Sequence, residues 1–572
     1  MKTLYFDELP RDIEALKDQN VDGIGIAGSM VYLADVFKAL VRYSSYDCIA
    51  LPARSRTPGD IRDNPVFHRY QGRISFLAEH ELSTLRNADQ LVIASGGPDL
   101  MGLHRKRCLI GRPHTPLTGI IHSINFTSQY FPAMLGFFFS PLSPFDALIC
   151  SSSAGLAAIE KFKAVMRERF AGAGLMPYEP RWQTPLIPLG VDTDTFSITA
   201  DVGELRQELA AEGKSVLLYF GRFSAASKAD LFPLLIALSA VIKRHSDSVL
   251  ILAGDDTQYR IAPDLQAFAA DLGCQEHVRV LPNPTTARKH QLYAMADVFV
   301  SLADSLQETF GLTLVEAMAA GLPVVASDWD GYRDLVCHGE TGFLVPTYMP
   351  DYPVAFDRVR GSGATNIPDL LASSTIVDLA AVEAHLDELL ANDGLRKRLG
   401  AAARKRAQLY FDWRRIIARY EELWDSLIEQ AAECPAPTGS LGLDIGQWGF
   451  REIFGHYGTT FVTPDARLRV TGLGRSPDAV GSLMRKVAMP ESWFLPARSV
   501  EILTLVNASP DMSVFEVLTR ATGQGHDYTQ TLGIVCRLAK YGLVSVAAAQ
   551  RLEQEAQPDG GTGTFTSAGM QR

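Results

Sequence analysis

Paired cysteines, an excess of positive charge and long apolar runs are all lacking in this chain of 572 residues. Its seven cysteines are scattered, with no Cys-x-x-Cys pair, which argues against a structural zinc site and against a disulfide framework. The formal net charge of −11 argues against a general nucleic-acid binder, because such proteins neutralise phosphates with lysine and arginine. We therefore expect no nucleic-acid partner.

A membrane-spanning segment is not expected either. The apolar stretch from Phe131 to Phe139 ends at Ser140 and Pro141, far short of the roughly 20 residues that a spanning helix needs. With nearby lysines and arginines it could form an interfacial face for a lipid-linked acceptor, which leaves peripheral membrane contact open. An aromatic core segment or a segment of the acceptor cleft, beside a solvated charged helix, is the favoured alternative. The amino terminus, Met1 to Glu8, has no apolar core of a signal peptide, so we expect a cytoplasmic protein.

The length and composition are those of a globular protein with more than one core. A chain of 572 residues exceeds a single hydrophobic core, and 47% of its residues are hydrophobic. This predicts two large domains and a further, smaller region.

Two carboxylates eight residues apart, Glu308 and Glu316, surround a glycine that precedes a helical run. Residues 298–302 read as a buried strand, 303–309 as a polar loop, and 312–320 as a helix closed by Gly321. The first N–H groups of such a helix can hold a phosphate, and Gly311 lets the backbone come close. Carboxylates on either side suit the hydroxyls of a sugar and a ribose. The alternative is that Glu308 stabilises the helix start electrostatically and Glu316 is a surface residue.

Two cations follow another predicted strand. Residues 215–220 read as a strand that runs into Gly221 and Arg222, and Lys228 comes just before the apolar helix 231–241. Open α/β sheets bind ligands where parallel strands end. Arg222 could grip phosphate oxygens with its planar fork, while Lys228 acts as a point charge. An ordinary exposed pair is the alternative, but two cations beside the positive end of a helix call for an anion.

Together these motifs resemble the retaining GT-B glycosyltransferases of the group 1, or family 4, type. The resemblance rests on the order and spacing of five segments between residues 185 and 428. They are Gly221-Arg222 with Lys228, residues 250–255, residues 296–301, Glu308 to Glu316, and residues 339–346. It implies an α/β protein of two Rossmann-like domains that face each other across a cleft, with the nucleotide-sugar donor mostly on the second.

The resemblance also implies roles for individual residues. Arg222 and Lys228 would hold the donor diphosphate, Glu308 would contact the transferred sugar, and Glu316 the ribose. His122, at the end of an apolar strand, would face the transferred sugar, so the implied catalytic set is His122, Arg222, Lys228 and Glu308. The amides around Phe310, Gly311 and Leu312 would complete the phosphate cradle.

A glycine-rich pattern at residues 23–28 invites a dinucleotide-binding interpretation. The next predicted strand, 47–52, ends in Ala53 and Arg54 rather than in the acidic residue that would take a ribose diol, so we do not expect NAD. By resemblance, Gly28 and Ser29 would instead approach the donor from the first domain.

The predicted organisation has five parts. Residues 1–190 form the acceptor-side domain, 191–410 the donor domain, and 411–432 a helix that crosses back to the first domain. Residues 433–556 form a small, mainly helical accessory domain that weakly resembles a winged helix, and 557–572 a disordered tail. The accessory domain is expected to serve protein contact or dimerisation. The polar stretch 348–374 is expected to be a long loop.

The resemblance implies a metal-independent enzyme without a cofactor. It would move a hexose-type unit from a nucleoside-diphosphate sugar to a hydroxyl of a glycan, a lipid-linked or a small-molecule acceptor, with retention. The alternatives are a related sugar-nucleotide hydrolase, epimerase or phosphorylase, and a non-catalytic scaffold that presents the C-terminal module.

Overall fold

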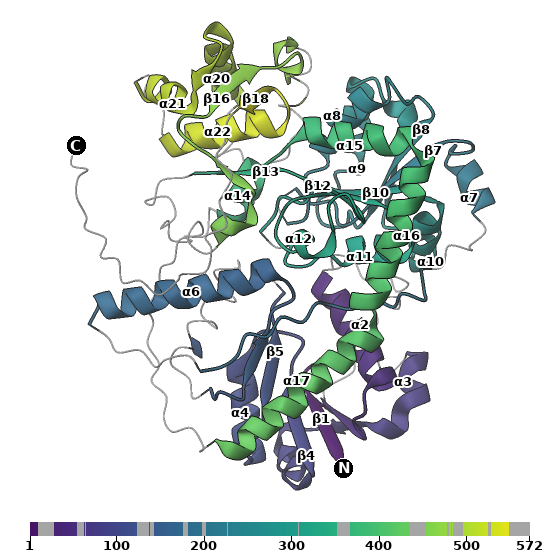
Figure 1. Ribbon diagram of the computed structural model, residues 1–572, viewed down its shortest axis with the longest axis vertical. Coiled ribbons are helices and arrows are strands. Elements are labelled where there is room, and N and C mark those ends of the chain that lie inside the picture. Colours follow the sequence, from purple (N-terminus) through teal and green to yellow (C-terminus); the bar gives the residue numbers. More distant parts are fainter. Residues whose placement is uncertain are drawn as a thin grey trace.

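A computed structural model describes most of the chain (Figure 1). The described residues are 1–9, 28–53, 62, 64–122, 136–137, 142–174, 181–196, 202–225, 227–306, 308–351, 367–434, 454–477, 480–481, 483, 496–523 and 528–547. The glycine-rich pattern at 23–28, apart from Gly28, most of the apolar stretch 131–139, and the predicted tail lie outside them.

The first domain is built on a six-stranded parallel sheet. Its strands lie in the order β3-β2-β1-β4-β5-β6, so the chain reverses its direction of progress across the sheet between β1 and β4. The strands are β1 (Lys2–Phe6), β2 (Cys48–Pro52), β3 (Ile74–Leu77), β4 (Gln90–Ala94), β5 (Leu117–Ile120) and β6 (Ala147–Ile149). The helices are α2 (Gly28–Tyr43), α3 (Pro65–Tyr70), α4 (Leu100–Ile110) and α6 (Ser153–Gly172).

The second domain repeats this plan. Its six parallel strands lie in the order β12-β11-β10-β7-β8-β9, with the reversal between β7 and β10. The strands are β7 (Ser215–Phe220), β8 (Ser248–Gly254), β9 (Val278–Pro282), β10 (Val298–Ser301), β11 (Val324–Ser327) and β12 (Gly342–Val345). The helices are α7 (Gly203–Glu208), α8 (Phe232–Val241), α9 (Ala262–Asp271), α10 (Thr286–Met295), α11 (Leu312–Ala319), α12 (Tyr332–Leu335), α15 (Leu379–Ala391) and α16 (Asp393–Tyr410).

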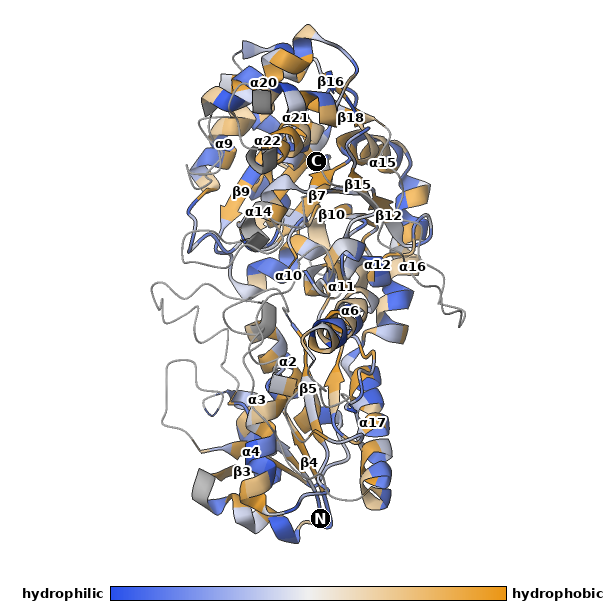
Figure 2. Ribbon diagram, turned by 90° about the vertical axis from the view of Figure 1, so that its left-hand side faces the viewer, coloured by the Kyte–Doolittle hydropathy of each residue, from blue (hydrophilic) through white to orange (hydrophobic). Residues whose placement is uncertain are grey.

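The strands of the second sheet are apolar, in keeping with their burial between layers of helices. Every residue of β8 is buried, as is every residue of β10 and β11, because helices cover both faces of a parallel sheet. Figure 2 shows orange, the colour of apolar residues, around the labelled strands β7 and β10, and most of the blue on the helices and connections around the sheets. The α/β class and the two Rossmann-like sheets of the GT-B arrangement are confirmed.

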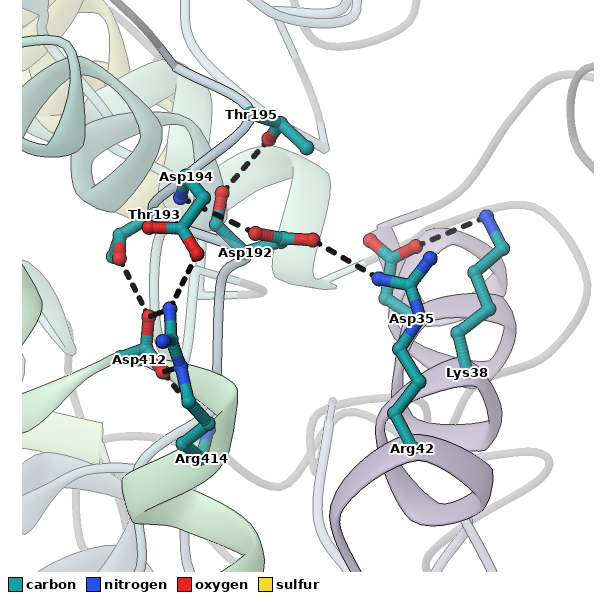
Figure 3. Close-up of polar contacts among 9 residues, drawn as sticks. All are labelled: Asp35, Lys38, Arg42, Asp192, Thr193, Asp194, Thr195, Asp412 and Arg414. Carbon is teal, nitrogen blue, oxygen red and sulfur yellow. Dashed lines mark hydrogen bonds and ion pairs between the residues drawn. The ribbon is translucent and has the colours of Figure 1, made fainter. Parts of the chain in front are cut away.

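The chain crosses between the two domains twice, and the crossings run side by side. The linker 191–196 pairs with the start of α17 (Trp413–Glu433): Val191 forms a bridge with Asp412, and Thr193 Oγ1 donates to Asp412 Oδ2 at 2.5 Å. Arg414 binds Asp194 at 2.6 Å, and Arg42 of α2 binds Asp192 at 3.3 Å (Figure 3). The two connections are therefore held together at the junction of the domains.

Helix α17 returns to the first domain, as Figure 1 shows. Its apolar side chains recur every three or four residues, at Trp413, Ile416, Ile417, Tyr420, Trp424 and Leu427, and all are buried. Tyr420 OH lies 3.1 Å from Tyr32 OH of α2, and Trp424 Nε1 donates to Thr118 Oγ1 at 3.1 Å. A helix thus begins directly after Asp412, where the sequence analysis places the crossing helix 411–432.

The stretch 348–374 is not the continuous loop that the sequence predicts. Strand β13 (Thr347–Pro350) and helix α14 (Ile367–Ser374) occupy its ends, and residues 352–366 lie outside the described part. Strand β13 pairs with β14 (Ile376–Val377) and with β15 (Thr460–Val462), which is more than 100 residues away in the chain. The prediction fails because the partner strand β15 is distant in sequence, so no local pattern indicates that β13 pairs with it.

The C-terminal module, defined here as the described residues 466–547, combines a small sheet with helices. Strands β16 (Arg467–Val470), β17 (Met512–Ser513) and β18 (Val544–Ala547) form an antiparallel sheet in the order β17-β16-β18. Its helices are α20 (Pro496–Ala508), α21 (Val514–Gly523) and α22 (Tyr528–Lys540), so the region is helical in large part, as the sequence predicts. The winged-helix assignment and the five domain boundaries stay predictions. Within the described part of the chain, no helix combines the length and apolar character needed to cross a membrane.

Candidate active site

Residues from two loops of the second sheet meet at the reversal between β7 and β10. Lys228 follows β7, and Glu308 follows β10. Lys228 Nζ lies 2.6 Å from Glu308 Oε1 and 2.7 Å from Oε2, and both side chains are largely buried. Carboxyl ends of strands at such a reversal are where open α/β sheets bind ligands. The structure thus brings together two of the predicted site residues.

Arg222 lies in the same loop as Lys228. Its backbone carbonyl accepts a hydrogen bond from Tyr219 OH at 3.1 Å, which fixes the start of the loop. Arg222 Nε is inaccessible to solvent and has no hydrogen-bond partner among the residues that the structure describes. A buried donor without a partner is costly, so a hydrogen bond donated from this nitrogen to an anionic oxygen would lower the free energy.

The start of α11 follows shortly after Glu308 of this ion pair. Gly311 adopts a φ of 114°, a left-handed conformation that glycine accepts readily, and no side chain caps the helix. A Cβ at this position would lie 2.5 Å from the Tyr332 ring, so both conformation and space require glycine. The uncapped amides that follow are available for an anion. Phe310 packs edge to face on Phe411, and Leu312 begins the helix.

Gly331 packs closely against the loop that carries Glu308. Its N–H donates to Glu308 O at 3.2 Å, and a Cβ at Gly331 would lie 2.3 Å from Thr309 O. The neighbouring Asp330 is fully buried, and this burial, together with the charge of Glu308, raises the pKa of Asp330 well above its ordinary value.

Glu316 has partners that the sequence analysis missed. Lys289 Nζ lies 2.5 Å from Glu316 Oε1, and Tyr293 OH donates to Glu316 Oε2 at 3.0 Å. Lys289 and Tyr293 are four residues apart on α10 and therefore share one face of that helix. This i, i+4 spacing was the available signal, but nothing in it specified Glu316 as the partner. The carboxylate is buried, so the interpretation of Glu316 as a solvated surface residue is wrong.

His122 lies where the two domains touch. It follows β5, and its Nε2 forms a hydrogen bond with Gly96 O, while its ring lies 4.8 Å from that of Tyr32. Thr309, next to Glu308, donates its Oγ1 hydrogen to His122 O. Burial lowers the pKa of His122 to about 4, so the imidazole is neutral at pH 7. The carboxyl ends of the two sheets therefore meet with His122 beside the Glu308 loop.

Gly28 and Ser29 lie at the start of α2. The structure does not describe their side chains, so it leaves their predicted role open. Asp35, two turns further along α2, lies within electrostatic range of Lys289 and Glu316. Helix α2 of the first domain therefore faces the Glu316 region of the second. Among the described residues, no group of three or more His, Cys, Asp or Glu side chains could hold a metal ion.

Comparisons with known proteins agree with this geometry. The sequence profile of the family described as "Glycosyl transferases group 1" matches residues 201–352. The chain is 30% identical over 302 residues to a phosphatidyl-myo-inositol mannosyltransferase of Mycobacterium tuberculosis (strain ATCC 25618 / H37Rv), across 51% of this chain and 69% of that protein. It is 34% identical over 164 residues to a D-inositol 3-phosphate glycosyltransferase of Mycobacteroides abscessus, across 28% of this chain and 35% of that protein.

Among solved structures, a sucrose-phosphate synthase from Thermosynechococcus elongatus aligns with a TM-score of 0.49 at 19% identity. The alignment covers 75% of this chain and 100% of that one.

Proposed function

Since the chain belongs to the group 1 glycosyltransferases, we propose that it transfers a hexose-type sugar from a nucleoside-diphosphate sugar to an acceptor hydroxyl, with retention of configuration. The observation that carries the proposal is the buried ion pair of Lys228 and Glu308 at the reversal of the second sheet, with Arg222 in the same loop as Lys228 and with the uncapped start of α11 three residues after Glu308.

The proposed donor site divides the nucleotide sugar among these groups. Arg222, Lys228 and the amides around Gly311 bind the diphosphate, where two cations and the helix dipole oppose its charge. Glu308 accepts hydrogen bonds from hydroxyls of the sugar, and Glu316, held by Lys289 and Tyr293, accepts them from the ribose. Gly28 and Ser29 approach the donor from α2.

The proposed reaction breaks the bond between C1 of the sugar and the diphosphate oxygen. The acceptor oxygen attacks C1 from the same face, and its proton passes to the departing diphosphate, so charge and atoms balance. Arg222 and Lys228 stabilise the negative charge that develops on the leaving oxygen, usually the largest catalytic contribution. The neutral His122 imidazole faces the transferred sugar and can form a hydrogen bond with one of its hydroxyls. In this proposal no metal or cofactor takes part.

Two relatives are named for inositol-containing molecules, so inositol phosphate and phosphatidylinositol are the first acceptors to test. Phosphatidylinositol would also bring the protein into contact with a membrane surface. We propose a cytoplasmic enzyme, where nucleotide sugars are made and consumed.

Nucleotide binding tests the donor site without knowledge of the acceptor. UDP, GDP and ADP are compared by thermal shift, and one of them at 100 times its dissociation constant should stabilise the folded protein by about 2.7 kcal/mol. Arg222→Ala should abolish this shift. Arg244→Ala is the matched control, because Arg244 binds Asp387 on the outer surface of the same domain. No shift with any nucleotide would refute the donor site.

The transfer itself is tested with the sugar form of the nucleotide that binds. Acceptor-dependent product with unchanged anomeric configuration, read by NMR, is the expected result. Free sugar without any acceptor would indicate a hydrolase instead, and binding without turnover would indicate a scaffold.

A further inference from the structure

The end of helix α22 in the C-terminal module is buried against the second domain. Lys540, the last residue of α22, and the next residue, Tyr541, are 1% and 3% exposed. Helix α22 packs on α14 and on β14, and Figure 1 shows the module stacked directly on this part of the second domain. A lysine is almost never buried to this extent unless it is paired.

Lys540 finds three acceptors. Its Nζ contacts Asp304 Oδ2, donates to Ala372 O at 2.8 Å, and lies 3.7 Å from Asp230 Oδ2. Tyr541 OH donates to the same oxygen of Asp230 at 2.6 Å. All three acceptor residues are buried, so this is a water-excluded polar cluster in which electrostatic contacts are strong.

The two carboxylates of the cluster belong to the loops of the candidate active site. Asp230 lies two residues after Lys228, and Asp304 lies four residues before Glu308. One loop leaves β7 and the other leaves β10, and 74 residues separate the two carboxylates in the sequence. Lys540 thus joins the loops on one side, as the Lys228–Glu308 ion pair joins them on the other.

The charges of the Lys540 cluster are compatible with its permanent burial. One ammonium group faces two buried carboxylates, which alone would leave an excess negative charge. Burial raises the pKa of Asp304 to about 7, because the charge of Asp230 adds to the desolvation that Lys540 only partly offsets. Asp304 is therefore partly protonated near neutral pH, which reduces the excess negative charge.

We propose that Lys540 and Tyr541 are positioning residues of the donor site, which hold the loops 221–231 and 302–311 together so that Arg222, Lys228 and Glu308 converge. The effect on the donor site rests on the proposed function, whereas the link between the two loops rests on the contacts of the cluster. It makes the C-terminal module a structural part of the active site, beyond the protein-docking or dimerisation role that the sequence analysis expected.

The test uses the full chain with Lys540→Met and Tyr541→Phe. Lys540→Met removes the charge with little loss of volume, and Tyr541→Phe removes only the hydroxyl that binds Asp230. Amide hydrogen exchange without ligand should rise in both loops in each variant. Affinity for whichever of UDP, GDP or ADP stabilises the wild-type protein should fall about tenfold in Lys540→Met, within the usual range of coupling between linked sites, and by less in Tyr541→Phe.

Two controls separate positioning from general damage to the module. Arg469→Met breaks an exposed ion pair with Asp511, and Val517→Ala opens a cavity in the core of the module. Neither should change nucleotide affinity at a temperature where all variants are folded. Adding Asp304→Asn to Lys540→Met should recover part of the affinity, because it removes an unpaired buried carboxylate.

The outcomes are distinct. One outcome would overturn this inference and leave the proposed function standing. In it, Lys540→Met and Tyr541→Phe both keep wild-type affinity and exchange, while Arg222→Ala abolishes nucleotide binding. An affinity loss in Val517→Ala equal to that in Lys540→Met would also overturn it. No nucleotide binding by the wild-type protein would overturn the proposed function and this inference with it.

Discussion

The ion pair between Lys228 and Glu308 permits a quantitative test of the candidate active site. Both Oε atoms lie within 2.7 Å of Lys228 Nζ, and the side chains are only 13% and 8% exposed. With an effective dielectric constant of about 20, two unit charges about 3 Å apart attract each other by roughly 5 kcal/mol. The desolvation of both groups offsets part of this attraction, so we expect a net coupling of about 2–3 kcal/mol.

A double-mutant cycle measures this coupling. Lys228→Met leaves Glu308 as an unpaired buried carboxylate, so the free energy of unfolding should fall by about 3–4 kcal/mol. Glu308→Gln should cost less, because the amide oxygen still accepts a hydrogen bond from Lys228. In the double variant no unpaired charge remains, and the loss should be well below the sum of the single losses. The assay is urea denaturation followed by circular dichroism, since urea does not screen charge.

An exposed pair in the same domain provides the control. Arg288 contacts both carboxylate oxygens of Glu208 at 2.7 Å, but these side chains are 32% and 54% exposed. The same cycle on this pair should give about 0.2–1 kcal/mol. Only this second value should fall further in 1 M sodium chloride. Equal couplings in the two cycles, or less than about 0.5 kcal/mol for Lys228 and Glu308, would refute the argument from burial.

Two further predictions concern His122 and Gly331. Unfolded histidine titrates near 6.5, whereas burial lowers the pKa of His122 to about 4, so the unfolded chain binds the extra proton first and stability is lost as the pH falls between these values. From pH 7.5 to pH 5 this group should cost about 2 kcal/mol, and His122→Gln should remove that part of the pH dependence in urea titrations; an unchanged slope would contradict the shift. Gly331→Ala should displace the Glu308 loop and weaken nucleotide binding, because the new Cβ would lie 2.3 Å from Thr309 O. Gly472→Ala, where no atom lies within 4 Å of the new Cβ, should bind nucleotide like the wild-type protein, and equal affinities in the two variants would refute the steric argument.

Much of the second domain could be predicted because its signals are local. The apolar run 215–220 and the helix after Gly311 are specified by hydrophobic pattern and by a glycine that must adopt a positive φ. Parallel strands then place Lys228 and Glu308 at one edge, so the sequence predicted the loops but not the ion pair between them.

The features that were missed depend on residues far apart in the chain. Lys289 meets Glu316 from a separate helix, and β13 finds β15 only after more than 100 intervening residues. Lys540 is 236 residues from Asp304, so no periodicity or spacing links them. Such contacts follow from tertiary packing, which a single sequence does not display.

Helix α17 has a consequence for how the protein is made. Trp424 of this helix donates to Thr118 of β5, 306 residues earlier, so the first sheet is synthesised long before the helix that covers it. At about 5–20 residues per second, the nascent chain waits roughly 15–60 s for Trp424 after Thr118 has been added. During this time the face around Tyr32 and Thr118 lacks its covering helix, although the second domain is being completed. The first domain, begun first on the ribosome, therefore gains its covering helix only after both sheets have been synthesised.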